Sequence, residues 1–359
     1  MKIARALTIA AAALAVAGLA VQCVNLRRFS KLRPARGRPR SIVACLAVRD
    51  EAPTVVRCIE ALLAQPEVEA VAVCDDRSID GTLQILERLQ SENPRVWIAT
   101  LPAGSGGSKR AALSAAAARA GDCDIPYLLF TDADVVFEDG AAGALQQCAR
   151  TFHANAVSAW PRVRVRGLSD VLFAPLVPEL LLQVLPMWRP DDPRCTAGNG
   201  QAFLVERRAY FDCGGHDGAA VVEDVELARR LRSAGFRVAL ASAADVAVVD
   251  GYGSARGALD GLGRSLYGAG GAIACVAYAL WQCAPACAIF GLRKSPMPAA
   301  VALSAVVAAR ALQARHMREP LACVVLAFVS HAVAALGAIR AAFLGASGRL
   351  TWRGRTLVV

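Results

Sequence analysis

From Ser41 onward, short runs of apolar residues alternate with stretches whose apolar positions recur at helical spacing. A buried strand needs only a short apolar run, whereas a helix that covers a sheet carries an apolar stripe. The alternation predicts an α/β fold, in which helices cover a parallel sheet. The expected strands are Ile42–Val48, Val71–Cys74, Val96–Ala99 and Tyr127–Phe130, and the expected helices are Pro53–Leu63, Thr82–Leu89 and Lys109–Ala120.

Longer apolar runs lie towards the two ends of the chain. Ala6–Leu26, Gly268–Leu292 and Leu321–Ile339 contain no Asp, Glu, Lys or Arg. A helix rises about 1.5 Å per residue, so each run can cross a hydrocarbon core of about 30 Å, and we expect transmembrane helices at both ends. The shorter run Pro296–Ala309 has two interpretations: it can span if Arg310 snorkels, or it can lie in the interface as an amphipathic segment.

The first apolar run has a second interpretation, because Lys2 and Arg5 precede it as in a cleavable signal peptide. Signal peptides carry an apolar region of about 7–15 residues. Since this run is longer, we expect a retained anchor.

The distribution of charge predicts how the chain is oriented in the membrane. The formal net charge is +10, and seven basic residues lie within residues 27–40, directly after the first apolar run. Only Lys2 and Arg5 precede that run, so the positive-inside rule predicts a multi-pass protein of the cell (inner) membrane with its middle part in the cytoplasm. The basic stretch is not part of a nucleic-acid-binding motif, so we expect no nucleic-acid partner.

The basic tail, with Arg349, Arg353 and Arg355, favours a cytoplasmic C-terminus and an even number of crossings after the middle part. Whether residues 296–314 span stays open at this point. The expected organisation is a membrane helix (1–26), a basic linker (27–40), an α/β domain (41–267), a membrane region (268–345) and a tail (346–359).

Acidic residues stand where the expected strands end, and in open α/β sheets ligands bind beyond these carboxyl ends. Asp75 and Asp76 follow the second strand, where carboxylates can accept hydrogen bonds from a nucleoside. Capping and turn chemistry would equally explain the nearby Ser78, Asp80 and Gly81.

The candidate metal ligands are carboxylates, because the twelve cysteines contain no CxxC pair and no cluster with zinc spacing. Asp132 and Asp134 follow the strand Tyr127–Phe130 directly. In an extended chain, residues two apart face the same side, so both can point at one Mg²⁺ or Mn²⁺ ion. A solvated loop is the alternative.

Two later segments combine polar side chains with small residues. Asn199, Gly200 and Gln201 precede an apolar run and suit the close approach of a polar ligand, although a plain turn explains them equally. Glu223 and Asp224 precede a helical pattern that Gly235 closes. For Asp224 an N-cap is the alternative to a chemical role.

The glycine-rich stretch Gly104–Gly107 leads into the helix that begins at Lys109. Its amides could meet a phosphate, but it lacks the Walker register, and a flexible loop is the simpler interpretation. Lys109 is the more specific phosphate contact.

In their order along the chain, these motifs resemble the family 2 glycosyltransferases of the GT-A fold, over about Ser41–Tyr267. The resemblance implies a Rossmann-like mixed sheet with flanking helices, between N- and C-terminal transmembrane helices. It implies the following roles: Glu51, Asp75, Asp76, Lys109 and Asp132 bind the nucleotide sugar, Asp132 and Asp134 hold the metal, and Asp224 is the catalytic base. Asp50 stands where the family has Asn.

The run from Gly198 through Gly214-Gly215-His216 to Glu223-Asp224 is similar to the branch acting on carotenoid, hopanoid and ceramide-like lipids, as is the tail Trp352–Arg355. This likeness implies that Asn199, Gly200, Gln201, Glu223 and Arg264 contact acceptor or sugar. No Gln-x-x-Arg-Trp follows Asp224, which puts a long-polymer product in doubt.

The expected function is a membrane-bound inverting glycosyltransferase that uses a nucleotide-diphosphate sugar and Mn²⁺ or Mg²⁺ to glycosylate a lipid hydroxyl. Two alternatives remain, a polyprenyl-phosphate sugar synthase and a non-catalytic membrane module. The presence of every acidic motif position argues against the module.

Overall fold

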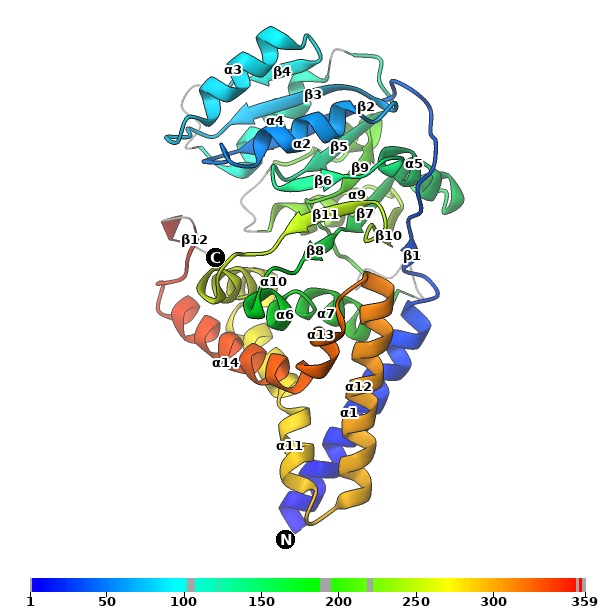
Figure 1. The fold of residues 1–359 in the computed structure, drawn as a ribbon, viewed down its shortest axis with the longest axis vertical. Coiled ribbons are helices and arrows are strands. Elements are labelled where there is room, and N and C mark those ends of the chain that lie inside the picture. The colour runs from blue at the N-terminus through cyan, green and yellow to red at the C-terminus, as the bar shows by residue number, and fades with distance from the viewer. Residues whose placement is uncertain are drawn as a thin grey trace.

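The computed structural model describes residues 2–101, 107–121, 123–187, 195–217, 222–352 and 355–356. An α/β part holds the main sheet, and a group of helices extends away from it along the long axis (Figure 1). The predicted α/β fold is confirmed.

The main sheet has the strand order β1-β10-β7-β9-β5-β2-β3-β4. All its strands run parallel except β9, which is antiparallel to both β5 and β7, so the sheet is mixed. The strands are β1 (Ser30–Lys31), β2 (Ile42–Val48), β3 (Val68–Asp75), β4 (Val96–Ala99), β5 (Tyr127–Thr131), β7 (Ala156–Trp160), β9 (Phe203–Glu206) and β10 (Val238–Ser242).

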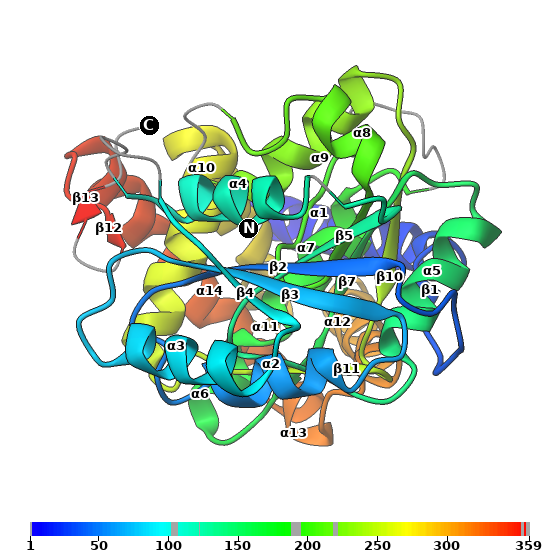
Figure 2. The ribbon, with the colours of Figure 1, turned by 90° about the horizontal axis from the view of Figure 1, so that it is seen from above.

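Helices cover both faces of this sheet, and a hydrophobic core lies on each side. In the view from above, α2 and α3 lie on one side of β2 and β3, and α4 lies on the other (Figure 2). These helices are amphipathic or alanine-rich, so each buries one stripe against the strands. The covering helices are α2 (Val55–Leu63), α3 (Thr82–Glu92), α4 (Lys109–Arg119), α5 (Ala141–Thr151), α8 (Arg207–Asp212) and α9 (Glu223–Ser233).

A second sheet lies beside the first and was not predicted. It has the order β6-β11-β8, formed by β6 (Val135–Phe137), β11 (Ala247–Asp250) and β8 (Arg162–Arg164). Two short strands near the C-terminus, β12 (Thr351–Trp352) and β13 (Arg355–Thr356), pair with each other. Arg353 and Gly354 of the predicted tail motif lie outside the described residues.

The basic segment after the first helix is fastened to the α/β part. Its strand β1 pairs with β10, and Phe29 and Leu32 on either side of β1 are buried. Further along, the Gly37 N–H donates to Glu67 Oε1 at 2.7 Å, and the Arg38 N–H donates to Gln146 Oε1 at 2.7 Å. This segment is therefore part of the folded unit.

Four helices are long and apolar enough to cross a membrane: α1 (Lys2–Asn25), the segment Gly270–Gly291, α12 (Pro296–Met317) and α14 (Ala327–Ala346). The second segment joins the end of α10 (Ala255–Gln282) to α11 (Ala284–Gly291). Within α10, Gly270 and Gly271 have non-helical dihedral angles, which break the helix where the apolar run begins. In Figure 1, α1, α11 and α12 run side by side, and α14 lies above α11 at an angle to these helices, where it packs against α10.

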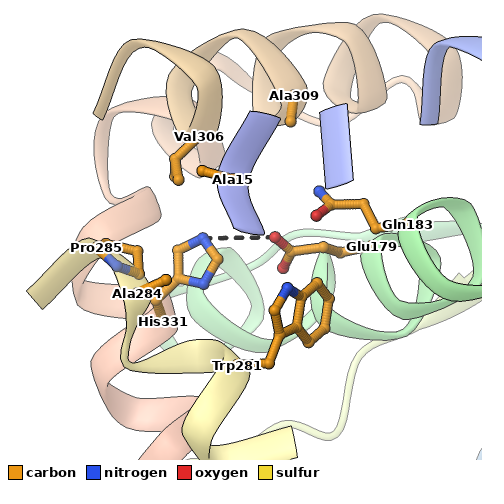
Figure 3. Close-up of a pocket in the computed structure, with 9 residues that line it drawn as sticks. All are labelled: Ala15, Glu179, Gln183, Trp281, Ala284, Pro285, Val306, Ala309 and His331. Carbon is orange, nitrogen blue, oxygen red and sulfur yellow. Dashed lines mark ion pairs between the residues drawn. The ribbon is translucent and has the colours of Figure 1, made fainter. Parts of the chain in front are cut away.

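Arg310 does not snorkel, contrary to one of the two expectations for its segment. Its Nη2 donates to Glu179 Oε2 at 2.9 Å, and the two side chains are 1% and 4% exposed. Glu179 belongs to α7 (Leu176–Val184), and its other oxygen lies 3.4 Å from His331 Nε2 of α14 (Figure 3). Three helices thus meet at one buried carboxylate.

Replacing Arg310 with Met should strongly destabilise the protein, because Glu179 would remain buried with its arginine partner gone. The expected loss is about 3–5 kcal/mol, read from unfolding in detergent micelles. The double variant Arg310→Met, Glu179→Gln should recover much of it, since neutral replacements of a whole buried pair are often tolerated. Arg315→Met, on the same helix but exposed, is the matched control. Equal losses for both single variants would contradict the ion-pair explanation.

Candidate active site

The candidate site lies where the carboxyl ends of β5, β2 and β3 meet. These strands are parallel neighbours, so the loops that follow them leave the sheet on the same side. Glu51 follows β2, Asp75 is the last residue of β3 and Asp76 follows it, and Asp132 and Asp134 follow β5. The edge therefore collects five carboxylates from three loops.

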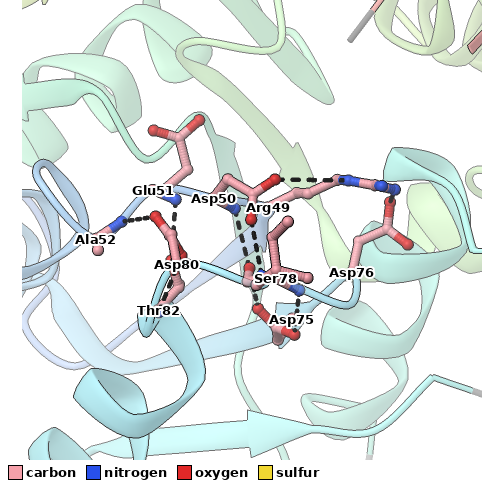
Figure 4. Close-up of polar contacts among 10 residues, drawn as sticks. Arg49, Asp50, Glu51, Ala52, Asp75, Asp76, Ser78, Asp80 and Thr82 are labelled. Atoms are coloured by element: carbon pink, nitrogen blue, oxygen red, sulfur yellow. Dashed lines mark hydrogen bonds and ion pairs between the residues drawn. The ribbon is translucent and has the colours of Figure 1, made fainter. Parts of the chain in front are cut away.

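Hydrogen bonds tie the loop after β2 to the loop after β3 (Figure 4). The Asp50 N–H donates to Ser78 Oγ at 2.9 Å, and the Ile79 N–H donates to Asp50 Oδ1 at 2.8 Å. Asp50 has φ of 54°, which aspartate tolerates better than most residues. The Glu51 N–H donates to Thr82 Oγ1 at 2.9 Å. The two loops thus form one preorganised unit.

Turn chemistry accounts for much of the acidic segment after β3. The Ser78 N–H and hydroxyl donate to the two oxygens of Asp75 at 3.0 and 2.5 Å. Asp80 accepts the Thr82 hydroxyl at 2.6 Å, which holds the pKa of Asp80 below its ordinary value. Asp76 is buried, and Arg49 Nη1 lies 3.6 Å from its Oδ2.

Asp132 and Asp134 follow β5 in a turn, not in the extended chain that the sequence argument assumed. The Val135 N–H closes this turn on the Asp132 carbonyl at 3.3 Å. The carboxylates are nevertheless close enough to interact. Burial raises the pKa of Asp134 above its ordinary value, and the negative charges of Asp132 and Glu51 raise it further.

A divalent cation fits the chemistry around Asp134. Its Oδ1 atom is buried and has no hydrogen-bond partner among the described residues. A buried carboxylate oxygen beside other carboxylates is a donor set that Mg²⁺ or Mn²⁺ prefers. The described residues contain no preformed cluster of three or more His, Cys, Asp or Glu side chains around one point. The protein would therefore supply only a few oxygen ligands to a bound cation.

Lys109 joins the β5 loop to the start of α9. Its Nζ lies 2.7 Å from Asp132 Oδ1 and 2.7 Å from Glu223 Oε1. Burial alone would lower the pKa of Lys109, but the two carboxylates outweigh it and hold the pKa above its ordinary value. Conversely, burial would raise the pKa of Glu223, but Lys109 and Arg264 hold it below its ordinary value. Lys109 and Glu223 are therefore both charged at neutral pH.

Asp224 lies at the second position of α9, and the N-cap alternative is wrong because Val222 is the N-cap. Its Oδ2 accepts the Gly200 N–H at 2.8 Å, and its Oδ1 accepts the Val225 N–H at 2.8 Å. Burial, followed by the neighbouring charge of Glu223, raises the pKa of Asp224 to about 6. This carboxyl group is thus mostly ionised at neutral pH and takes up a proton as the pH falls through about 6.

The loop from Thr196 to Gln201 packs against the start of α9. A Cβ on Gly198 would lie 2.1 Å from the Asp224 carbonyl oxygen, so only glycine permits this approach. Asn199 stabilises the loop itself, since its Nδ2 donates to the Ala159 carbonyl and to Gln201 Oε1, both at 3.2 Å. The alternative of a plain turn therefore explains part of this motif, while Gly200 contacts Asp224 directly.

Arg264 of α10 approaches the same site from the helical side, where its charge acts on Glu223. Tyr252 lies beside it and was not assigned as a site residue. Tyr252 is 52% exposed, and its pKa is raised by partial burial and by the charges of Asp132 and Asp134, against the charge of Arg264. No motif signals this tyrosine; its place just after β11 is the only indication.

The predicted glycine-rich loop is described only in part. Gly104–Gly106 lie outside the described residues, and Gly107 leads into α4. Ser108 is the N-cap of that helix, because its Oγ accepts the Ala111 N–H at 3.1 Å. This cap fixes where α4 begins and hence where Lys109 projects.

The site thus combines a pair of loops able to take a nucleoside, carboxylates able to hold a cation, a partly exposed ammonium group, and a carboxyl group that can take a proton. Such a set suits group transfer from a phosphorylated donor to a nucleophile that must lose a proton.

Comparisons with known proteins agree with this geometry. The sequence model of a family described as "Glycosyltransferase like family 2" matches residues 39–256. No curated protein matches the chain. Among solved structures, the mannosyltransferase PcManGT from Pyrobaculum calidifontis in complex with GDP-Man and Mn²⁺ has a TM-score of 0.55 at 18% identity, covering 94% of this chain and 99% of that chain.

TarS 1–349 from S. aureus has a TM-score of 0.42 at 13% identity, covering 86% of this chain and 92% of that chain. Its complex with UDP-GlcNAc has a TM-score of 0.43 at the same identity and coverage. The TarS likenesses are too weak to support an argument, whereas the likeness to PcManGT confirms the predicted GT-A-like fold. Because the family model covers more than half of the chain, the chain belongs to glycosyltransferase family 2 and is a nucleotide-sugar transferase.

Proposed function

We propose that this protein is a membrane-bound, metal-dependent, inverting glycosyltransferase whose acceptor is a lipid hydroxyl. The observation that carries the proposal is the half-buried carboxyl group of Asp224, whose pKa is raised to about 6. Two backbone N–H groups fix its orientation, and it stands beside the ion pair of Lys109 and Glu223. A base with a pKa near the working pH is best suited to deprotonate a hydroxyl group.

In the proposed reaction, the acceptor oxygen attacks the anomeric carbon as Asp224 takes its proton. The bond from that carbon to the donor's phosphate oxygen breaks, and the nucleoside diphosphate leaves with the bonding electrons. One displacement inverts the anomeric centre. Lys109 supplies positive charge near the departing phosphate, and the loops bearing Glu51, Asp75 and Asp76 hold the nucleoside.

Asp134 and Asp132 would hold the divalent cation, which supplies charge neutralisation for the donor's phosphates. The support comes from the unpaired buried oxygen of Asp134. PcManGT, which shares the fold, was solved with Mn²⁺. Burial of Asp134 among carboxylates disfavours its charged form, and a bound cation would offset this cost.

For the membrane arrangement, we infer that α1, the segment ending in α11, and α12 cross the bilayer. Arg310 of α12 does not need to reach the interface, because its charge is paired with Glu179. In place of the expected span Leu321–Ile339, we infer that α14 lies at the bilayer surface. Arg340 Nη1 of α14 pairs with Asp260 Oδ1 at 2.8 Å, and the two side chains are 38% and 29% exposed. Such a pair is costly when it faces hydrocarbon and inexpensive in the interface. The two crossings after the α/β part would return the chain to the cytoplasm.

One observation favours the alternative acceptor, a polyprenyl phosphate. Arg57, Arg164 and Arg166 approach the single carboxylate of Asp250 at 3.1, 3.2 and 2.8 Å. Three guanidinium groups around one carboxylate leave a net positive charge, which could attract a phosphate. Asp250 is two residues before Tyr252 in the sequence. A phosphate acceptor would need no strong base, so the role of Asp224 distinguishes the two functions.

Asp224→Asn should reduce transfer to a lipid hydroxyl by about 10²–10⁴-fold, because an amide cannot take the proton. The change in stability should be small. The variant loses one hydrogen bond from a backbone N–H, but removing a carboxylate whose pKa is raised relieves an unfavourable charge at neutral pH. The measurement is transfer from a panel of nucleotide sugars to lipid alcohols, beside donor binding and the melting temperature.

Asp212→Asn, at an exposed position of α8, is the matched control and should retain activity. In the unmodified enzyme, kcat/KM should fall as pH drops through about 6, since Asp224 must be ionised to act. Full transfer to a hydroxyl acceptor by the Asn variant would rule out the base. Turnover restricted to polyprenyl phosphate would favour the alternative, and absence of both donor binding and turnover would indicate a non-catalytic module.

Chelation should abolish transfer, and Mn²⁺ or Mg²⁺ should restore it, because carboxylates alone cannot neutralise a diphosphate. Asp134→Asn should raise the metal concentration needed for half-maximal rate, whereas Asp139→Asn, which is exposed, should not. Undiminished activity in excess chelator would refute the metal role.

Tags inserted after Gly121 and after Gly348 should both be labelled only once cells are permeabilised, and a tag between Arg293 and Lys294 should be labelled in intact cells. This pattern follows if α14 does not cross. If intact cells label the tag after Gly348 but not the tag after Gly121, α14 crosses the membrane.

A further inference from the structure

A groove lies between α6 (Leu168–Phe173), α7 and the first half of α10. These helices occupy the space between the sheets and the group of apolar helices (Figure 1). The apolar lining includes Phe173, Leu176, Val177 and Leu262. Tyr252 and Ser265 are the polar residues that line it in the described part of the chain. Its surface therefore offers contact to hydrocarbon and few hydrogen bonds.

One end of the groove reaches the active site through Tyr252. The ring of Tyr252 packs over α10 at Gly261, where an added Cβ would lie 2.5 Å from the ring. Gly261 lies one helical turn before Arg264 on α10, and the charge of Arg264 acts on Glu223 of the active site. A molecule lying in the groove would thus have one end beside the charged cluster.

The other end of the groove continues into apolar surface. Leu168, Val177 and Val184 on α6 and α7 are 64%, 41% and 56% exposed. The helix that forms the opposite wall, α10, leads past Gly270 into the segment that is apolar enough to cross a membrane. Exposed apolar surface that adjoins such a segment is expected to contact lipid. The groove therefore connects hydrocarbon to the catalytic carboxylates.

We propose that this groove binds the alkyl or isoprenoid chain of the acceptor, in the stretch next to the hydroxyl group that reacts. The inference rests on the proposed function and adds the place and direction from which the acceptor enters. Sugar or peptide acceptors present many hydrogen-bonding groups, which this lining would leave unpaired. A hydrocarbon chain gains from burial here, and Tyr252 marks the point where its polar end begins.

The test compares two tryptophan variants on α7. Val177→Trp fills the groove, whereas Val184→Trp adds the same side chain seven residues later, outside the lining. Both valines are at least 41% exposed, so both variants should fold. With the best nucleotide sugar of the panel, Val177→Trp should lower kcat/KM for hexadecanol or farnesol in detergent micelles at least about tenfold, an order of magnitude expected for one or two lost buried methylenes.

Transfer to butanol, which is too short to fill the groove, should change little in either variant, and so should the KM for the donor. Equal loss with butanol and hexadecanol, or equal effects of both variants on the long acceptors, would overturn the groove as the chain-binding site. Melting temperatures of the two variants report whether either change disturbs the fold.

A second measurement does not depend on turnover. A diazirine-bearing hexadecanol, irradiated with the unmodified full-length protein in micelles, should label peptides of α7 and of residues 252–266, and unlabelled hexadecanol should compete. Val177→Trp should reduce this labelling and Val184→Trp should not. Labelling confined to α1 and α12 would overturn the proposal. If the groove is labelled but no alcohol is glycosylated, the proposed function fails while the binding site stands.

Discussion

The active site depends above all on the ammonium group of Lys109, held between Asp132 and Glu223. These three residues come from the start of α4, the loop after β5 and the start of α9, so one cation connects three separate parts of the chain. Without it, two carboxylates would face each other in a partly buried site, and at least one would take up a proton. The charge of Glu223 then acts on Asp224. Burial is the main cause of the raised pKa of Asp224, the charge of Glu223 adds to it, and the positive charge of Lys109 offsets part of it.

The strand-end acids could be predicted because an apolar run followed by aspartates marks the point where a buried strand meets solvent. Lys109 could be proposed as a phosphate contact from its place at the start of a helix, but its ion pairs with Asp132 and Glu223 could not, because these residues lie far apart in the sequence. The small sheet escaped prediction because β6, β8 and β11 are too short to show a period. Tyr252 had no motif around it. The ion pair of Glu179 and Arg310 joins residues 131 positions apart, and no local pattern reports such a contact.

Helix α7 links the apolar helices to the chemistry. Its Glu179 points into the buried junction with α12 and α14, while Leu176 and Val177 on the same short helix face the groove beside Tyr252. A shift of α7 would therefore move the groove wall and strain the buried ion pair at the same time. The position of the membrane helices and the shape of the proposed acceptor entrance are coupled through nine residues, Leu176–Val184.

The two-residue strand β1 has a practical consequence for making this protein without its membrane helices. Its pairing covers one edge of β10, and the burial of Phe29 and Leu32 fills the adjoining surface. A truncated protein starting at Ser41 would expose this edge of β10 to water, together with the apolar surfaces on which Phe29 and Leu32 pack. Exposed strand edges recruit other chains, so such a fragment would tend to aggregate. A soluble version is better begun near Leu26, so that the sheet keeps its own edge strand.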